Sequence, residues 1–268
     1  MRRAGFAADE ISWDPVGGTV DLAALEGTDA VVHLAGAGVG DHRWTSAYKA
    51  EILRSRVLGT QTIARAITQL ERPPQVLVSG SAIGWYGDTG DHEVDERDPA
   101  GTSFLAEVVQ AWEAATGSAA DAGIRVVHAR SGLVVARNGG AWARLFPIFR
   151  LGAGGRLGAG TQYWSWISLR DETAALIFCL QQPSLSGAVN LTGPRAVTNA
   201  EATAAMGRVM GRPTLLPVPA VALKLALGEF SSEVLGSIRV LPRALKEAGF
   251  AWTDITIESA ISAAWRSP

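Results

Sequence analysis

The sequence lacks the features that mark several functional classes. It has a single cysteine in 268 residues, so no intrachain disulfide can form, and the apolar run 174–180 around Cys179 predicts a buried side chain. No apolar stretch approaches the roughly 20 residues of a membrane span, and the opening residues lack the apolar core of a signal peptide. The net charge of −2 and the absence of a basic run argue against general nucleic-acid binding. We therefore expect a cytoplasmic protein with a small-molecule substrate and neither nucleic acid nor membrane as partner.

Histidine is scarce and scattered. The four histidines are His33, His42, His92 and His128, and none has metal-ligand spacing, so no metal site is expected. His33 lies inside an apolar segment and is more typical of a core histidine than of a base. A cluster of acidic residues at 91–98 is most simply a solvated loop.

The stretch 76–88 combines a predicted strand with a loop that carries several hydroxyl groups. The apolar run from Val76 to Val78, with two prolines before it, predicts a buried strand whose carboxyl end opens into a loop rich in glycine. Ser79, Ser81 and Tyr86 bring hydroxyls to that end, where open α/β sheets bind ligands. The alternative is a turn whose hydroxyls satisfy local backbone groups.

Strands and helices alternate through the first half. Apolar runs at 29–36, 76–82 and 124–130 read as strands, and helical spacing is found at 44–70 and 103–120. A further strand is predicted at 9–14 and a small helix at 22–25. This order is typical of parallel βαβ units, so the predicted fold class is α/β.

The regular alternation of strands and long helices ends beyond Arg137. A short apolar helix at 142–150 and a glycine-rich arm precede an aromatic strand at 163–167, and Asp171 is expected to cap a helix. Strands at 187–191 and 215–218 alternate with helices at 199–209, 220–227, 242–248 and 254–265. We predict a domain at 1–137 and a smaller α+β portion at 138–268, packed against it across a cleft.

Five short motifs in order resemble one family. They are His33-Leu34-Ala35-Gly36, Ser79-Gly80-Ser81-Ala82 with Tyr86-Gly87-Asp88, Arg130-Ser131-Gly132-Leu133-Val134, Trp166-Ile167 before Asp171, and Leu241-Pro242-Arg243 before Ala248-Gly249-Phe250. Together they resemble an atypical branch of the extended short-chain dehydrogenase/reductases, similar to NAD(P)-dependent epimerase/dehydratases with a C-terminal domain of unknown function. The resemblance implies a Rossmann-type parallel sheet.

The glycine-rich G-x-x-G-x-x-G turn with which such families open is absent. The resemblance therefore implies a sheet that lacks its first βαβ strands, with Met1 near the end of the family's second strand. On that basis, the segment from Met1 to Val20 is expected to be poorly anchored.

The resemblance also implies cofactor contacts. Arg2 and Arg3 stand where a basic residue of relatives meets the adenosine phosphate, which favours NADP over NAD, although a basic N-terminus can be incidental. Other matched positions are Leu34, Ala35, Gly36, Glu51, Arg56, Ser79 and Val134. Exposed helix charge remains the alternative for Glu51 and Arg56, and ordinary packing the alternative for Val134.

The Tyr-x-x-x-Lys pair of standard short-chain reductases is missing. No lysine follows any of the three tyrosines at that spacing, and a phenol needs a nearby cation to exchange protons near neutral pH. We therefore predict Ser81 as the group that orients a carbonyl and Tyr86 as the proton donor. The predicted function is NADP-dependent oxidation–reduction or epimerisation of a small carbonyl or sugar-nucleotide substrate. The alternative is a non-catalytic dinucleotide- or metabolite-binding protein of the same fold.

Overall fold

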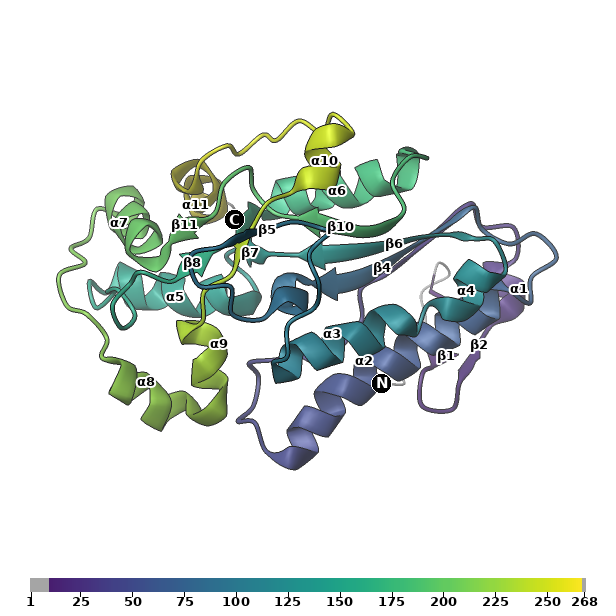
Figure 1. Ribbon diagram of the computed structural model, residues 1–268, viewed down its shortest axis with the longest axis horizontal. Helices are drawn as coiled ribbons and strands as arrows, with labels where there is room; N and C mark the ends of the chain where they lie inside the picture. The colour runs from purple at the N-terminus through teal and green to yellow at the C-terminus, as the bar shows by residue number, and fades with distance from the viewer. Residues whose placement is uncertain (1–9, 267–268) are drawn as a thin grey trace.

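A four-stranded parallel sheet forms the centre of the protein, whose computed structural model describes residues 10–266 (Figure 1). Its strand order is β10-β6-β4-β3. The bounds are Ala30–His33 for β3, Val76–Ala82 for β4, Arg125–Ser131 for β6 and Gly187–Leu191 for β10. Ala30 is paired with Val76, and Val76 with Arg125, in parallel register. The predicted α/β class and the parallel neighbours at 29–36 and 76–82 are confirmed.

Both faces of this sheet are covered by helices, as its continuous apolar strands require. Val76 and Val78 pack toward α6 (Leu169–Gln181) and α10 (Arg243–Glu247), whereas Leu77 faces the opposite side. On that side lie α2 (Ser46–Ile67), α3 (Phe104–Ala114) and α4 (Gly117–Asp121). Figure 1 shows the two helical layers above and below the strands.

Polar caps fix where the main helices begin. Thr45 and Ser103 each accept a backbone hydrogen bond from the residue three positions later, and Thr198 forms a capping box with Glu201. The predicted cap at Asp171 is wrong, because Ser168 caps α6. The Asp171 carboxylate instead accepts hydrogen bonds from the backbone of residues 253 and 254. The helix predicted over 103–120 is two helices, α3 ending at Ala114 and α4 starting at Gly117.

The segment before the sheet forms a hairpin. Strands β1 (Trp13–Asp14) and β2 (Thr19–Val20) pair antiparallel, and α1 (Leu22–Leu25) follows. The strand predicted over 9–14 is therefore shorter and does not join the main sheet within the described residues. Ile11 and Val20 pack on the α2 side of the core, and the Trp13 ring meets His33 edge-on at 5.6 Å. Residues 10–20 thus have some core contacts but no pairing with the main sheet and no buried residue, so the expectation of poor anchoring is not contradicted there, and residues 1–9 lie outside the described part.

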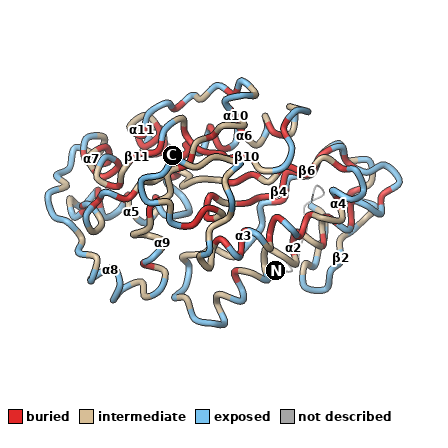
Figure 2. The backbone as a smooth tube through the Cα atoms, in the orientation of Figure 1, coloured by how far each residue is buried: buried red, intermediate tan, exposed pale blue. Residues whose placement is uncertain are grey.

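The C-terminal portion has a core of its own, drawn from residues 135–264 and centred on Trp142, Phe146, Trp166 and Ile261. Its elements are β7 (Leu133–Val135), α5 (Gly140–Arg150), β8 (Tyr163–Trp164), β9 (Trp166–Ser168), β11 (Val197–Thr198), α7 (Asn199–Met210), α8 (Ala220–Leu227), η2 (Gly228–Phe230), α9 (Ser231–Leu235), β12 (Arg239–Val240) and α11 (Ile257–Arg266). The strand expected at 215–218 is reduced to a single bridge between Leu157 and Val218. Figure 2 shows buried backbone concentrated in the sheet and in this second core. The domain boundary at 137/138 stays a prediction.

Candidate functional site

The carboxyl ends of β3, β4, β6 and β10 meet along one edge of the sheet because all four strands are parallel. His33 is paired with Ser79 in register, so Leu34–Gly36 leaves β3 beside the end of β4. The turn η1 (Ile83–Tyr86) and the short strand β5 (Glu93–Val94) follow β4 at this edge. Ligands of open α/β sheets bind at such an edge.

Leu34, Ala35 and Gly36 form an exposed backbone loop at that edge, and Leu34 is 54% exposed. Two α2 side chains hold the next residue, because Ser55 Oγ accepts from Ala37 N at 3.1 Å and Arg56 Nη1 donates to Ala37 O at 2.9 Å. The loop is thus accessible on its outer side and fixed on its inner side. This geometry suits close approach of a ligand to backbone groups.

Glu51 and Arg56 have different surroundings, although both lie on α2. Glu51 is exposed, whereas Arg56 is half-buried beneath Gly36, with its guanidinium 5.0 Å from the Trp112 ring centre. A Cβ at Gly36 would lie 3.2 Å from Arg56 Cγ. Arg56 therefore supports the loop, and Glu51 is a solvated charge in this structure.

Both serines of β4 are buried. Ser79 is fully buried, and its hydroxyl donates to Gly80 O at 3.2 Å. Ser81 is 5% exposed and donates to Glu113 Oε1 at 2.6 Å. Ser79 is also paired with His33 on one side and with His128 on the other, so neither its hydroxyl nor its backbone is accessible in this structure, and its cofactor role stays a prediction.

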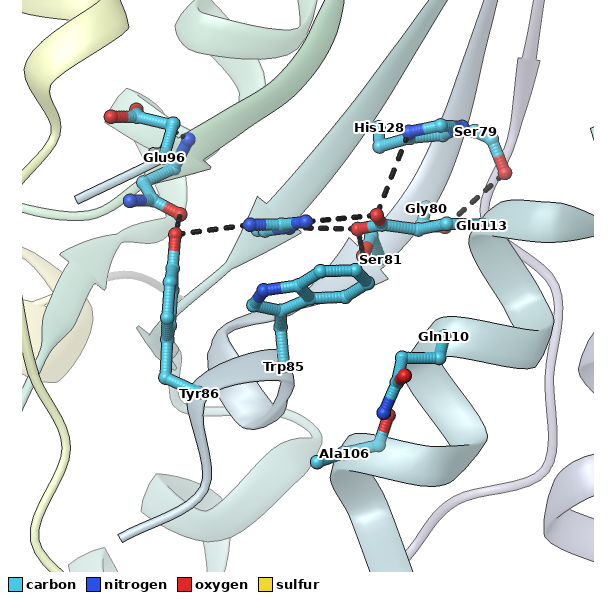
Figure 3. Close-up of polar contacts among 12 residues, drawn as sticks. Ser79, Gly80, Ser81, Trp85, Tyr86, Glu96, Ala106, Gln110, Glu113 and His128 are labelled. Carbon is cyan, nitrogen blue, oxygen red and sulfur yellow. Dashed lines mark hydrogen bonds and ion pairs between the residues drawn. The ribbon is translucent and has the colours of Figure 1, made fainter. Parts of the chain in front are cut away.

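A buried hydrogen-bond network joins Ser81 to Tyr86 through residues of α3 and β6 and continues to β10 (Figure 3). Arg130 donates from Nε and Nη2 to the two oxygens of Glu113, at 2.8 and 2.9 Å. It also donates from Nη1 to the Tyr86 hydroxyl at 3.1 Å, and that hydroxyl donates to Asn190 Oδ1 at 2.8 Å. The structure therefore brings the two predicted catalytic hydroxyls into one network and gives each a protein partner.

The electrostatics of the network keep Tyr86 neutral. Burial raises the pKa of its phenol to about 12, and the opposing effect of Arg130 is smaller. Burial also acts to lower the pKa of Arg130, but the hydrogen bond and charge of Glu113 outweigh it and the pKa rises. Tyr86 in this state can hold a proton for donation and is a poor base near neutral pH.

His128 closes the network from β6. Its Nδ1 lies 3.7 Å from Glu113 Oε2, and its Nε2 lies 3.0 Å from Thr116 Oγ1. Burial lowers the pKa of this imidazole, although Glu113 acts in the other direction. His128 thus completes the set of polar neighbours that surround Glu113.

The remaining predicted residues lie away from this network or outside the described residues. Val134 is half-buried on β7, paired with Ile167 and packed on the sheet core. Arg2 and Arg3 lie outside the described residues. His33 is buried as expected, but its Nε2 has no hydrogen-bond partner among residues 10–266, and burial lowers its pKa to about 4.

The acidic segment 91–98 is not uniformly solvated, which corrects the sequence interpretation. Glu96 is half-buried, and its Oε1 accepts from the backbone nitrogens of Asn190 and Ala244. Its pKa is raised by burial, against the effect of those hydrogen bonds. Asp95 pairs with Arg97 and Arg243, so this segment fastens the C-terminal portion to the sheet edge.

Sequence reasoning missed Glu113, Arg130 and Asn190 as site residues. One signal was available, since Glu113 follows Trp112 on a mostly apolar helix and Arg130 ends an apolar strand, although Glu107 and Arg125 offer the same charges on the same two elements. A buried charge needs an opposite charge nearby, which would have suggested pairing the two. Asn190 gave no comparable signal. No group of three or more potential metal ligands occurs in the part of the chain from residue 10 to 266.

Comparisons with known proteins agree with this architecture. Residues 18–192 match the model of the NAD dependent epimerase/dehydratase family, and residues 218–264 match a domain of unknown function, DUF1731. An epimerase family protein of Mycobacterium bovis is 46% identical over 269 residues, covering 100% of this chain and 89% of that protein.

Two solved structures are also similar to this chain. The human epimerase family protein SDR39U1, solved with NADPH, has a TM-score of 0.86 at 31% identity, covering 90% of this chain and 83% of that one. A nucleoside-diphosphate sugar epimerase from Corynebacterium glutamicum has a TM-score of 0.76 at 32% identity, covering 94% of this chain and 48% of that one. With the two matched segments in the predicted order, the chain belongs to the NAD dependent epimerase/dehydratase family, within the atypical extended short-chain dehydrogenase/reductases.

Proposed function

We propose that this protein is an NADP-dependent oxidoreductase or epimerase that acts on a small carbonyl or sugar-nucleotide substrate. The observation that carries the proposal is the exposed, rigidly supported backbone of Leu34–Gly36 at the carboxyl edge of the sheet. The NADPH in the related human structure supports the choice of cofactor. Arg2 and Arg3 are proposed, from sequence alone, to favour the phosphorylated dinucleotide.

The residues present supply one part of a dinucleotide site along this edge, since the glycine-rich phosphate turn is absent from the sequence. Leu34, Ala35 and Gly36 would contact it through backbone and small side chains, while Arg56 and Ser55 hold the loop from below. Reversible hydride transfer is the chemistry that a nicotinamide cofactor supplies when bound. Ser81 would orient a substrate carbonyl and Tyr86 would hold the proton for transfer at Oη.

These two roles require a rearrangement. The Ser81 hydroxyl proton is directed at Glu113 and that of Tyr86 at Asn190, and both side chains are only 5% exposed. Substrate would have to displace one of these partners. Asn190, at the end of β10, is the partner whose movement would release the Tyr86 proton without separating Arg130 from Glu113.

The same burial favours a second candidate function, which is dinucleotide or metabolite binding without turnover. In that case the network is structural scaffolding under a binding surface. The two candidates share the cofactor site and differ in whether Ser81 and Tyr86 ever contact a substrate.

Cofactor binding is tested by adding NADPH and NADH to the whole chain and following NADPH fluorescence and the melting temperature. Ala35→Glu places a carboxylate on the exposed loop, and repulsion of the cofactor phosphates should weaken NADPH binding at least tenfold. Ala251→Glu, at an exposed position in a loop before α11, is the matched control. Equal NADPH affinity for the two variants, or no binding by the parent chain, would overturn the proposed site.

Turnover separates the two candidates. NADPH consumption is measured with a panel of small aldehydes, ketones and nucleotide sugars, for the parent chain and for Ser81→Ala and Tyr86→Phe. Loss of turnover with retained NADPH binding supports the enzyme. NADPH binding with no turnover of any substrate supports the binding protein.

A further inference from the structure

Exposed apolar side chains gather on one surface of the C-terminal portion. Half of the large apolar side chains that are exposed in residues 10–266 lie in two segments, 148–151 and 215–225. They are Ile148, Leu151, Leu215, Leu216, Val221 and Leu225, and the last four are 68–86% exposed. Isolated exposed apolar residues are normal, but a gathered set indicates an interaction surface.

The two segments lie side by side in space. Arg212 Nε donates to Arg150 O at 2.9 Å, and Val218 N donates to Arg156 O at 2.8 Å. The segment then enters α8, none of whose residues is buried. Figures 1 and 2 show α8 at one end of the molecule without buried backbone. A helix this apolar, with no buried residue, needs a covering partner.

Within residues 148–156 and 212–225 the charges are of one sign, and the exposed Glu229 just after α8 is paired with Lys49 at 2.5 Å. Arg150, Arg156, Arg212 and Lys224 are exposed, and none of them has an ion-pair partner within the described residues. From residue 138 to residue 228 the sequence has three acidic residues, Asp171, Glu172 and Glu201. The first two are buried, and Glu201 accepts the capping hydrogen bonds of α7.

The charge pattern discriminates between possible occupants. In a twofold contact through this surface, each cation would face cations of the second copy, and like charges oppose such an interface. A bilayer that contains anionic lipids offers both complements, since phosphates meet the arginines and the acyl boundary takes the leucines. The four apolar residues at 215–225 are mostly exposed, as interfacial insertion requires.

We propose that this surface, formed by residues 148–156 and 212–225, binds the headgroup region of an anionic lipid bilayer. The proposal departs from the expectation, based on sequence alone, that no membrane is a partner. It is independent of the proposed cofactor site, which lies at the sheet edge. Within residues 10–266, no helix has the length and apolar character to cross a bilayer.

Vesicle sedimentation tests the proposal on the whole chain. Vesicles of phosphatidylcholine alone are compared with vesicles containing about a third phosphatidylglycerol, at low and high salt. We expect binding to the anionic vesicles and its loss at high salt. Arg156→Gln with Lys224→Gln should weaken binding roughly 25-fold, since each cation near an anionic surface contributes about fivefold. Leu216→Ser with Leu225→Ser should weaken it at least tenfold.

Matched controls are exposed residues elsewhere. Val16→Ser with Ile255→Ser removes apolar surface, and Arg54→Gln with Arg65→Gln removes cations from α2. Both control pairs should sediment like the parent chain. Because every substituted side chain is exposed, unchanged melting temperatures are expected and checked.

Three results would overturn the proposal. They are failure of the parent chain to sediment with anionic vesicles, equal binding to vesicles with and without phosphatidylglycerol, and equal binding of the surface and control variants. A concentration-dependent dimer that Leu216→Ser with Leu225→Ser abolishes, with no vesicle binding, would identify a second copy as the occupant instead.

Discussion

Two buried carboxylates on opposite faces of the same strand have different surroundings. Arg130 and Ser131 are consecutive residues of β6, so their side chains point to opposite faces of the sheet. Arg130 meets Glu113 of α3 with two hydrogen bonds, and Ser81 adds a third to that carboxylate. Ser131 gives Glu172 of α6 a single hydrogen bond, and Glu172 Oε2 has no partner within the described residues.

The difference shows how a strand can face an ion pair on one side and, on the other, a carboxyl group that ionises only near pH 7. Each glutamate residue is 8% exposed, so burial alone does not distinguish them. Without a cation on its face, burial raises the pKa of Glu172 to about 7, although the Ser131 hydrogen bond acts to lower it. The Glu113 side balances its charge with Arg130, and it is this side that carries Ser81 and Tyr86.

The largest effect is expected when the buried ion pair between Arg130 and Glu113 is broken. Arg130→Met removes the cation and leaves Glu113 buried with the Ser81 hydroxyl as its main partner. Removing one partner of a buried ion pair costs about 3–5 kcal/mol. We expect that loss in the free energy of unfolding, measured by urea denaturation of the parent chain and of Arg130→Met at the same pH.

Two variants sharpen this result. Glu113→Gln combined with Arg130→Met removes the unpaired charge and should recover part of the loss. Arg97→Met, which breaks the exposed pair with Asp95, should cost no more than about 1 kcal/mol. A loss in Arg130→Met as small as that of Arg97→Met would show that the network does not depend on its charges.

A smaller effect is expected for Glu172, on the opposite face of the strand, and this effect depends on pH. The folded pKa of Glu172 is about 7, above its ordinary value of 4.5, so the folded state binds this proton more tightly than the unfolded state. The contribution of the protonated Glu172 to the free energy of unfolding is therefore full below about pH 4.5 and is lost as the pH rises through 7. Glu172→Gln cannot ionise. The stability of this variant relative to the parent should rise by up to about 3 kcal/mol over that window and then level off.

Taking the difference between variant and parent at each pH removes the contribution of other groups, including His33, whose lowered pKa gives the opposite slope. Ser131→Ala provides an internal control, because it deletes the hydrogen bond that favours the charged form. In that variant, the upper end of the pH window should move upward, while the lower end, set by the unfolded state, stays in place. A difference between Glu172→Gln and the parent that is flat from pH 4 to 8 would contradict the raised pKa of Glu172.

The same contrast explains what the sequence could and could not predict. The strands at 76–82 and 124–130 were predictable because apolar runs between glycine and proline have one stable place, the middle of a covered sheet. The parallel neighbours followed from the helices between them. The short hairpin at 13–20 was not predictable, because a two-residue strand gives no periodic signal.

Site residues follow a similar rule. Ser81 and Tyr86 could be placed at the sheet edge because they follow a recognisable strand. The pairing of Glu113 with Arg130 depends on which helix face meets which strand, and helical spacing alone also permits an exposed glutamate. Asn190 is 104 residues from Tyr86, and nothing local to either residue indicates their hydrogen bond.

The smallest expected effect is at the outer end of the charged network. Tyr86→Phe removes the hydroxyl that accepts from Arg130 and donates to Asn190, while the Arg130–Glu113 pair stays intact. We expect a loss of about 1–3 kcal/mol in the free energy of unfolding, less than for Arg130→Met, because no charge is left unpaired. Tyr163→Phe, at a half-exposed tyrosine, should change stability by no more than about 0.5 kcal/mol. If Tyr86→Phe destabilises as much as Arg130→Met, the phenol and the ion pair act as one unit. The Arg130–Glu113 pair could then not be separated energetically from the uncharged hydrogen bond between Tyr86 and Asn190.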